Sequence, residues 1–207
     1  MNEETLIRKI KPRLPASTND SEYRFESLPV ASLQGLDRDS RVIYIGTFSK
    51  VLFPALRLGY IVIPKDLVPS FIAVREAMDI FPPTLYQAVL TDFIGEGHFS
   101  RHLRRMRQLY RERRSILVEA LARELGARVR VRGDEAGLHL VATSPKGSPD
   151  RQVAAEAARQ GVWAMPLSAC YLGKASSRGF VLGYGGASVS EIREGVRRLR
   201  RILDEDG

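Results

Sequence analysis

The residues with the clearest chemical potential lie in one short stretch, residues 46–60 (GTFSKVLFPALRLGY). Lys50 carries a primary amine, and we expect it just past the carboxyl end of a strand, where open α/β sheets bind ligands. Walls of low dielectric at such a place favour the uncharged, nucleophilic form of the amine. The hydroxyls of Thr47 and Ser49 flank this lysine, and Arg57 follows with a guanidinium that can bind a phosphate or carboxylate in bidentate fashion.

An amine near an anion-binding arginine suits a ligand that carries both an aldehyde and a phosphate. Pyridoxal 5'-phosphate is the common cofactor of that description, because it forms a Schiff base with a lysine and serves as an electron sink in amino-acid chemistry. However, a pattern made only of Ser49, Lys50 and Arg57 occurs often by chance. An isolated lysine in a loop is ordinarily solvated. From these residues alone, a cofactor lysine and a solvent-exposed lysine both remain open.

Alternating strand and helix patterns must position this stretch. Residues 42–45 and 58–63 have the β-branched and aromatic composition of buried strands. Helical periodicity and stop signals predict helices over residues 66–78, 85–95, 98–125, 150–160 and 190–203, with Ser190 as the cap of the last. Further strands are expected at 128–132, 137–142, 162–167 and 179–184, the first two as an antiparallel pair. The fold class is therefore α/β or α+β.

Composition sets the broad class of protein. The 207 residues, 44% of them hydrophobic and 27% charged, suffice for one compact domain or a large piece with a small one. A single cysteine, Cys170, excludes an internal disulfide, and we expect it at a strand end or packed in a core. No leader pattern and no apolar run of about 20 residues is seen, so a cytoplasmic protein without a membrane segment is expected.

The net charge of +8 is the extreme feature of the composition, and it is concentrated in residues 101–114 and 193–201. Apolar residues recur at helical spacing in both segments, so arginine is expected to form a solvated polar face, with a nucleic-acid surface as the alternative. His98 and His102 lie four residues apart on a predicted helix but lack further ligands for a metal. We therefore expect no metal site and regard both histidines as surface residues.

Eight segments after Asp20 carry a resemblance to a known family. They are residues 20–25 (DSEYRF), 33–38 (LQGLDR), 42–50 (VIYIGTFSK), 53–60 (FPALRLGY), 92–107 (DFIGEGHFSRHLRRMR), 110–114 (YRERR), 137–140 (GLHL) and 182–184 (LGY). Together they resemble fold-type-I pyridoxal-phosphate enzymes, and specifically the aminotransferase-like domain of MocR-type regulators of the GntR family. The segment that ends at Lys50 resembles the Schiff-base segment of these enzymes.

This resemblance implies a fold and a set of site residues. Residues 1–20 mix Lys, Pro, Ser, Thr and Asn without periodicity, which predicts a tail or linker. The resemblance implies a remnant of the large cofactor-binding domain over 21–100, and a long helix with the small α+β domain over 101–207. It further implies that Lys50 forms the Schiff base with pyridoxal 5'-phosphate. Ser49 and Arg57 would hold the cofactor phosphate, and Thr47 would line the approach. The implied chemistry is amino-group transfer, with an amino acid or amine as ligand.

The sequence departs from the family pattern at two places. Residues 16–19 read ASTN where the family has an acidic motif that contacts the pyridine nitrogen and the ring hydroxyl. Val181 stands where an arginine would hold the substrate carboxylate. These departures support a second hypothesis, a noncatalytic effector-sensing or dimerisation module with weak or no cofactor binding.

Members of the family carry a winged helix-turn-helix domain and the first half of the large domain before this region. Residues 1–40 contain no recognition-helix pattern, so DNA binding by this chain alone is not expected. We expect a truncated or split form. Its partner would be a second copy in a homodimer or the missing N-terminal half, supplied in trans.

Overall fold

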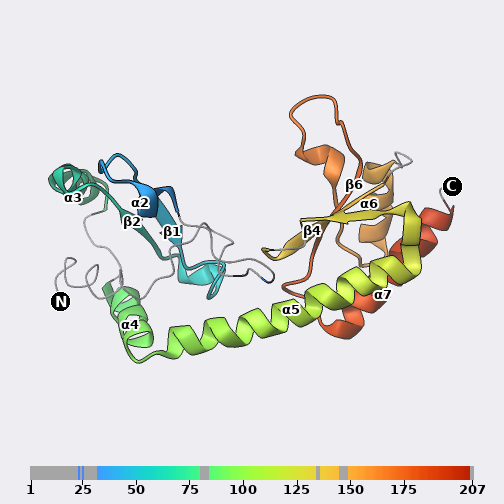
Figure 1. Ribbon diagram of the computed structural model, residues 1–207, viewed down its shortest axis with the longest axis horizontal. Coiled ribbons are helices and arrows are strands. Elements are labelled where there is room, and N and C mark those ends of the chain that lie inside the picture. The colour runs from blue at the N-terminus through green and yellow to red at the C-terminus, as the bar shows by residue number, and fades with distance from the viewer. Residues whose placement is uncertain are drawn as a thin grey trace. The chain divides into compact units, whose positions relative to one another are not determined.

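The computed structural model describes residues 23, 25, 32–79, 84–133, 136–144 and 149–205. These residues form two compact units (Figure 1), the first made of residues 32–105 and the second of residues 106–205 together with Tyr23 and Phe25. The predicted tail over residues 1–20, which includes the departure from the family motif at 16–19, lies outside the described residues. Within the described part of the chain, no helix is both long and apolar enough to cross a membrane.

The first unit is built on a two-stranded antiparallel sheet. Strand β1 (Tyr44–Thr47) pairs with β2 (Gly59–Val62), close to the strands predicted at 42–45 and 58–63. The helices of this unit are α2 (Leu33–Leu36), α3 (Val68–Met78), α4 (Thr84–Gly95) and the first turns of α5 (His98–Leu125). The short α2 is the one helical turn of the segment before β1, and its N-cap is Ser32, whose hydroxyl accepts a hydrogen bond from the Gly35 N–H.

The expectation that β1 and β2 are buried is wrong. Ile45 is 68% exposed, and Ile61, which lies directly opposite it across the pair, is 44% exposed. A strand is buried on both faces when it has sheet neighbours and covering helices. Among the described residues β1 and β2 pair only with each other, and α3 buries none of its residues. One face of this small sheet therefore stays open.

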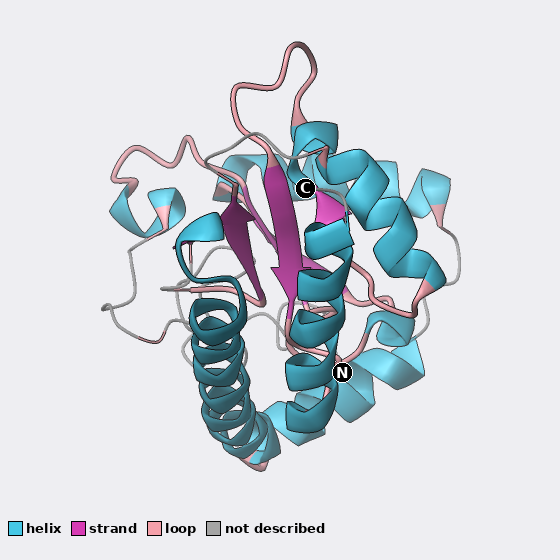
Figure 2. Cartoon of the chain, turned by 90° about the vertical axis from the view of Figure 1, so that its right-hand side faces the viewer, coloured by secondary structure: helices cyan, strands magenta, loops and turns pink. Residues whose placement is uncertain are grey.

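The second unit is a four-stranded antiparallel sheet packed against helices. Its strand order is β3 (Arg130–Arg132), β4 (His139–Thr143), β6 (Gly179–Gly183) and β5 (Met165–Pro166). Figure 2 shows helices running along the strands; the core joins the sheet to α5, α6 (Asp150–Arg159) and α7 (Val189–Glu205). The sheet contributes the buried side chains of Leu140, Ala142, Phe180 and Leu182. Their alternation along β4 and β6 is the period of two that a half-buried sheet requires.

The cap predicted for the last helix is wrong by two residues. Helix α7 begins at Val189, so its N-cap is Ser188 rather than Ser190. The Ser188 hydroxyl accepts a hydrogen bond from the Glu191 N–H at 3.3 Å, and the Glu191 carboxylate accepts one from the Ser188 N–H at 2.7 Å. This reciprocal pair is a capping box, whose Ser-x-x-Glu pattern is present in the sequence.

Two further expectations in the second unit are wrong. The strand predicted over 162–167 is reduced to β5, which pairs with β6 only through Met165 and Pro166. Proline has no N–H to extend the ladder, which limits this edge strand. Cys170 is exposed in the short 3-10 segment Leu167–Cys170 and is not packed in a core.

A buried carboxylate joins three segments of the second unit. Asp150 is the first residue of α6 and is 2% exposed. Its oxygens accept hydrogen bonds from the Ser168 hydroxyl at 2.7 Å, the Ser168 N–H at 2.8 Å and the Gly179 N–H at 3.2 Å. Burial by itself raises the pKa of Asp150, but these donors outweigh it and the pKa lies below its usual value.

We expect Asp150→Asn to lower the free energy of unfolding at neutral pH by about 1–3 kcal/mol, because the new amide turns an N–H toward N–H donors. A depressed folded-state pKa gives stability that is present above the unfolded pKa, near 3.9, and is lost as the pH falls through the folded pKa. The difference between wild type and variant should therefore shrink in acid. Urea unfolding at neutral pH and at about pH 3 measures it, with the exposed Asp66→Asn as control. A difference that does not change with pH contradicts this role.

Candidate functional site

The predicted site residues lie at one end of the two-stranded sheet. Thr47 is the last residue of β1 and Gly59 is the first residue of β2, and the two are opposite each other. The loop of residues 48–58 joins these strands, and its base is closed by a hydrogen bond of 3.1 Å from the Phe48 N–H to the Leu58 carbonyl oxygen. All four predicted residues belong to this loop or to the strand end that leads into it.

Two hydroxyls meet at the start of the loop. The Thr47 hydroxyl accepts a hydrogen bond from the Ser49 N–H at 3.2 Å and donates one to the Ser49 hydroxyl oxygen at 3.1 Å. Both residues are half-buried. The Thr47 hydroxyl also lies 3.5 Å from the Leu58 carbonyl oxygen, so it links the start of the loop to its end. The structure thus brings together two of the residues that the sequence singles out.

Lys50 lies in a tight turn formed by residues 48–52. The Leu52 N–H donates to the Phe48 carbonyl oxygen at 2.9 Å and closes this turn. The side chains of Phe48 and Val51 are 3% and 4% exposed, whereas Lys50 itself is exposed. The described residues of the first unit therefore do not enclose Lys50 in the low-dielectric crevice that was expected around it. What the unit supplies is a fixed backbone beneath an exposed lysine side chain.

Arg57 has an unusual backbone conformation. It follows the short 3-10 turn Pro54–Leu56 with φ 50° and ψ 32°, in the left-handed region, and its N–H donates to the Pro54 carbonyl oxygen at 3.3 Å. For a residue with a Cβ, the left-handed backbone conformation is less favourable by about 1–2 kcal/mol. Backbone strain of this kind is concentrated at functional sites. Its side chain is exposed. Among the described residues Ser40 shares this conformation with φ 55°, so the backbone of Arg57 fixes the course of the chain into β2 without by itself marking a site.

Aromatic rings support the strand ends that carry the loop. The Tyr60 ring lies 5.5 Å from that of Phe48 and 5.9 Å from that of Tyr44, measured between centroids. It also covers Gly46, where an added Cβ would overlap the ring. An added Cβ at Gly59 would lie 2.9 Å from the Gly46 carbonyl oxygen. Glycine at these two places lets the strands and the ring approach closely, which fixes the direction in which the loop leaves the sheet.

His102 is a residue that sequence reasoning misjudged. It was expected on the surface, but it is half-buried and its Nε2 lies 2.9 Å from the Val51 carbonyl oxygen in the lysine turn. The available signal was its place between the buried positions Phe99 and Leu103 of α5. His98, by contrast, is exposed as expected. In the described part of the chain, no group of three or more potential metal ligands comes together.

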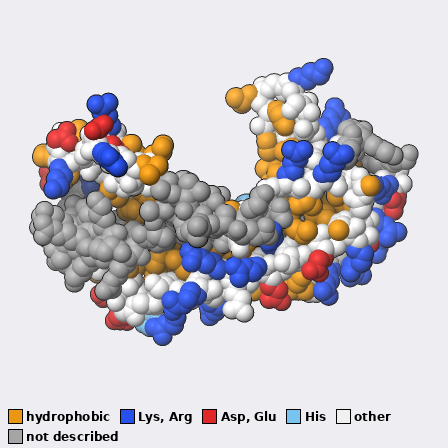
Figure 3. Space-filling model, viewed as in Figure 1, with side chains coloured by type: hydrophobic (Ala, Val, Ile, Leu, Met, Phe, Trp, Pro, Cys, Tyr) orange, Lys and Arg blue, Asp and Glu red, His pale blue; other side chains and the backbone are white. Residues whose placement is uncertain are grey.

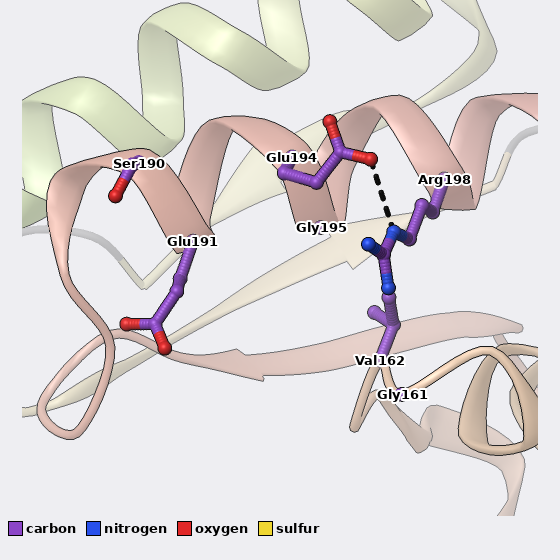
Figure 4. A pocket seen from close by; sticks show the side chains of 7 residues that line it. All are labelled: Gly161, Val162, Ser190, Glu191, Glu194, Gly195 and Arg198. Carbon is purple, nitrogen blue, oxygen red and sulfur yellow. Dashed lines mark hydrogen bonds and ion pairs between the residues drawn. The ribbon is translucent and has the colours of Figure 1, made fainter.

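The second unit contains a surface hollow of about 380 Å³ between the start of α7 and residues 161 and 162 (Figure 4). Its charged groups are used internally. The Arg198 Nε donates to the Glu194 carboxylate at 3.0 Å, and another nitrogen of the same guanidinium donates to the Gln160 carbonyl oxygen at 2.8 Å. Glu191 belongs to the capping box. None of the predicted site residues lines this hollow, so we assign it a structural role.

The side chains around the loop of residues 48–58 form a definite set of donors. They offer one primary amine, from Lys50, one guanidinium, from Arg57, and two hydroxyls, from Thr47 and Ser49. A guanidinium with hydroxyls suits a phosphate, and an accessible amine suits a carbonyl carbon. This donor set fits a ligand that carries both groups.

Comparison with known proteins agrees with this chemistry. The family model "Aminotransferase class I and II" matches residues 20–199. The chain is 44% identical over 181 residues to "Probable rhizopine catabolism regulatory protein MocR" of Rhizobium meliloti, an alignment that covers 87% of this chain and 37% of that protein. The chain therefore spans well under half the length of this curated relative.

Solved structures show the same likeness. The multiple substrate aminotransferase from Thermococcus profundus superposes with a TM-score of 0.80 at 27% identity, over 92% of this chain and 47% of that one. LysN, an alpha-aminoadipate aminotransferase from Thermus thermophilus solved with N-(5'-phosphopyridoxyl)-L-leucine, superposes with a TM-score of 0.79 at 28% identity, over 98% and 53% of the two chains.

The chain belongs to the class I and II aminotransferase family and has the fold of its fold-type-I members, as the sequence resemblance predicted. Within that family it is an aminotransferase-like domain of the kind found in MocR-type regulators of the GntR family.

We expect Gly46→Ala to loosen the sheet beneath the loop, because its methyl group must displace the Tyr60 ring. Overpacking of this kind costs about 1–3 kcal/mol, so amide exchange in β1 and β2 should accelerate roughly tenfold. Hydrogen exchange read by mass spectrometry measures this. Gly95→Ala is the matched control, since a Cβ there meets nothing within 4 Å. Exchange rates that match the wild type in both variants contradict the close packing of Gly46 and Tyr60.

Proposed function

We propose that this domain binds pyridoxal 5'-phosphate through the loop of residues 48–58. The amine of Lys50 would hold the cofactor through its aldehyde carbon, with the aldehyde oxygen lost as water, while Arg57 and Ser49 would hold the phosphate and Thr47 would orient Ser49. When bound, the cofactor supplies an electron sink for chemistry at the amino group of an amino acid or amine. The observation that carries the proposal is that the end of β1 and the loop of residues 48–58, whose base is closed by the Phe48–Leu58 hydrogen bond, hold the amine, the guanidinium and two hydroxyls that are joined by the Thr47–Ser49 hydrogen bond.

Each residue of the loop has a task that its geometry supports. The Thr47–Ser49 hydrogen bond holds the Ser49 hydroxyl at the start of the turn, close in the chain to the lysine. The left-handed backbone of Arg57 turns the chain into β2 while its guanidinium stays exposed to an anion. A guanidinium binds a phosphate through two parallel hydrogen bonds, which fixes the orientation of the ligand as well as its affinity.

The ligand class follows from the family and from one residue of the second unit. Val181 lies in β6 with Val141 and Met165 opposite it on the neighbouring strands, so an apolar row stands where the resemblance places a carboxylate-binding arginine. This supports an amine, or an amino acid whose carboxylate is held elsewhere. The same residue favours a second candidate function, a noncatalytic sensor that binds its effector through the cofactor. Similarity to proteins named as transcriptional regulators also supports the sensor.

A titration of the purified chain with pyridoxal 5'-phosphate tests the proposal. We expect a new absorbance band and, after borohydride reduction, a stable adduct that peptide mapping places on Lys50. Lys50→Ala should abolish the adduct. Arg57→Gln should weaken cofactor affinity by roughly 10-fold or more, since a charged hydrogen-bonding partner is worth about 1.5–3 kcal/mol. Lys65→Ala, an exposed lysine at the start of the short 3-10 segment before α3, is the matched control.

Spectra and peptide maps that are the same for wild type and Lys50→Ala contradict the proposal. Addition of amino acids and simple amines to the loaded chain separates the two candidate functions. Conversion of the bound cofactor to its amine form supports amino-group transfer. A spectral change without release of a keto acid or aldehyde product supports the sensor.

We also propose that further polypeptide covers the open face of the first unit, either a second copy of the chain or the N-terminal half that longer relatives possess. The first unit exposes large hydrophobic side chains, and Figure 3 shows hydrophobic side chains on its surface; the exposed residues include Ile43, Ile45, Ile61, Phe71, Ile72 and Met78. Ile45 and Ile61 are opposite each other in the β1–β2 pair and so share one sheet face. Monomeric proteins rarely expose a large contiguous apolar surface.

Light scattering after size-exclusion chromatography tests this association. We expect the wild type to run as a species larger than a monomer, and the double variant Ile45→Lys, Ile61→Lys to shift toward monomer because charges on the face oppose its burial. Trp163→Lys, which changes an exposed aromatic residue of the second unit, is the control. The proposal fails if the wild type stays monomeric and is not retained by the immobilised N-terminal half of the Rhizobium meliloti regulator.

A further inference from the structure

The turn that carries Lys50 is held from outside by the first turns of α5. The ring of Phe99 meets the ring of Phe48 nearly edge-on, with 6.1 Å between centroids and 75° between planes. Three residues further along α5, the Nε2 of His102 lies 2.9 Å from the Val51 carbonyl oxygen. Phe48 precedes Lys50 by two residues and Val51 follows it directly, so the helix contacts the turn on both sides of the lysine.

The His102 contact fixes the direction of one peptide group. A carbonyl oxygen only accepts, so the His102 ring must carry its proton on Nε2 and donate. The Val51 side chain is buried and the imidazole is half-buried, which limits the competition from water for this hydrogen bond. The bond inside the turn, from Leu52 N–H to the Phe48 oxygen, ties the turn to itself. The bond from His102 ties the turn to the helix.

We propose that His102 is a positioning residue for Lys50. By holding the Val51 carbonyl, it keeps the backbone of the lysine at a constant orientation, so that the amine leaves the loop in one direction. The lysine side chain is a flexible four-carbon stem, and the backbone at its root is the part that the fold can fix. A small misplacement of a reacting group is enough to lower its reactivity strongly. This inference rests on the proposed function, in which Lys50 bonds to the cofactor.

His98 provides a matched comparison on the same helix. It lies one turn before His102, but its contacts are with Phe93, Glu96 and Arg101 and not with the lysine turn. Its Nε2 is 3.1 Å from a Glu96 carboxylate oxygen, its Nδ1 is 3.0 Å from an Arg101 guanidinium nitrogen, and its ring stacks on Phe93 with 5.6 Å between centroids. Replacing His102 therefore removes the contact to the lysine turn, whereas replacing His98 removes a histidine from the same helix and leaves that contact in place.

Amide hydrogen exchange of the full chain tests directly whether the His102–Val51 hydrogen bond holds the turn. In His102→Leu, exchange at Leu52 and Phe48 should be roughly two- to tenfold faster, the range expected for one lost hydrogen bond. Exchange within β1 and β2 should match the wild type, which separates a local effect from general destabilisation. His102→Gln should restore slow exchange, because its side-chain amide also donates at similar reach. His98→Leu should leave the turn unchanged.

Trapping of pyridoxal 5'-phosphate on Lys50 by borohydride provides the second measurement. Affinity for the cofactor should fall by a similar factor in His102→Leu, and should stay at the wild-type value in His98→Leu. If His102→Leu does not fold, the comparison of His102→Gln with the shorter His102→Asn on folded protein replaces it. The Gln variant should then trap the cofactor better than the Asn variant.

The outcomes separate failure of this inference from failure of the proposed function. If wild type traps no cofactor on Lys50, the proposed function is wrong, and the exchange rates alone decide whether His102 holds the turn. If wild type traps the cofactor while His102→Leu matches it in both trapping and exchange, the positioning role is overturned and the proposed function stands. Faster exchange throughout β1 and β2 in His102→Leu assigns His102 to general stability and also overturns the role.

Discussion

The direction of an exposed side chain is set by the backbone beneath it, and in the first unit that constraint is the burial of two residues of the turn that carries Lys50. Phe48 and Val51 are nearly inaccessible, while the lysine and the arginine of the same loop are exposed. Apolar burial of about 1.5–3 kcal/mol per large side chain holds such a turn in place. The direction in which the loop presents Lys50 thus depends on Phe48 and Val51, which have no part in the proposed ligand binding.

The second unit shows the opposite arrangement, with a charge as the buried element. Asp150 connects the start of α6, the 3-10 segment at Ser168 and the first residue of β6 through donors that satisfy its carboxylate. Buried charges are tolerated when each oxygen finds hydrogen bonds, and here the donors come from segments far apart in sequence. Gly179 completes the arrangement with φ 142°, since an added Cβ would overlap the carbonyl group of Ala142.

Sequence reasoning succeeded where a local pattern determines the outcome. The limits of α5 at 98 and 125 were predicted because its apolar periodicity is uninterrupted, and the β3–β4 pair followed from strict alternation. Burial of β1 and β2 was predicted wrongly, because it depends on what covers a strand and not on its composition. The roles of His102 and Asp150 rest on contacts across the fold, 51 residues apart in the case of His102 and Val51, which no local pattern reveals. Thr47, Ser49, Lys50 and Arg57 remain predicted site residues.

Helix α5 belongs to both units, since residues 98–105 lie in the first and residues 106–125 in the second. Nucleating a helix is costly, whereas each added turn is cheap. Whichever unit forms its part of α5 first therefore supplies the other unit with a helix that needs only to be extended. Because both units share one helix, a helical nucleus that forms in either unit can extend along the backbone into the other.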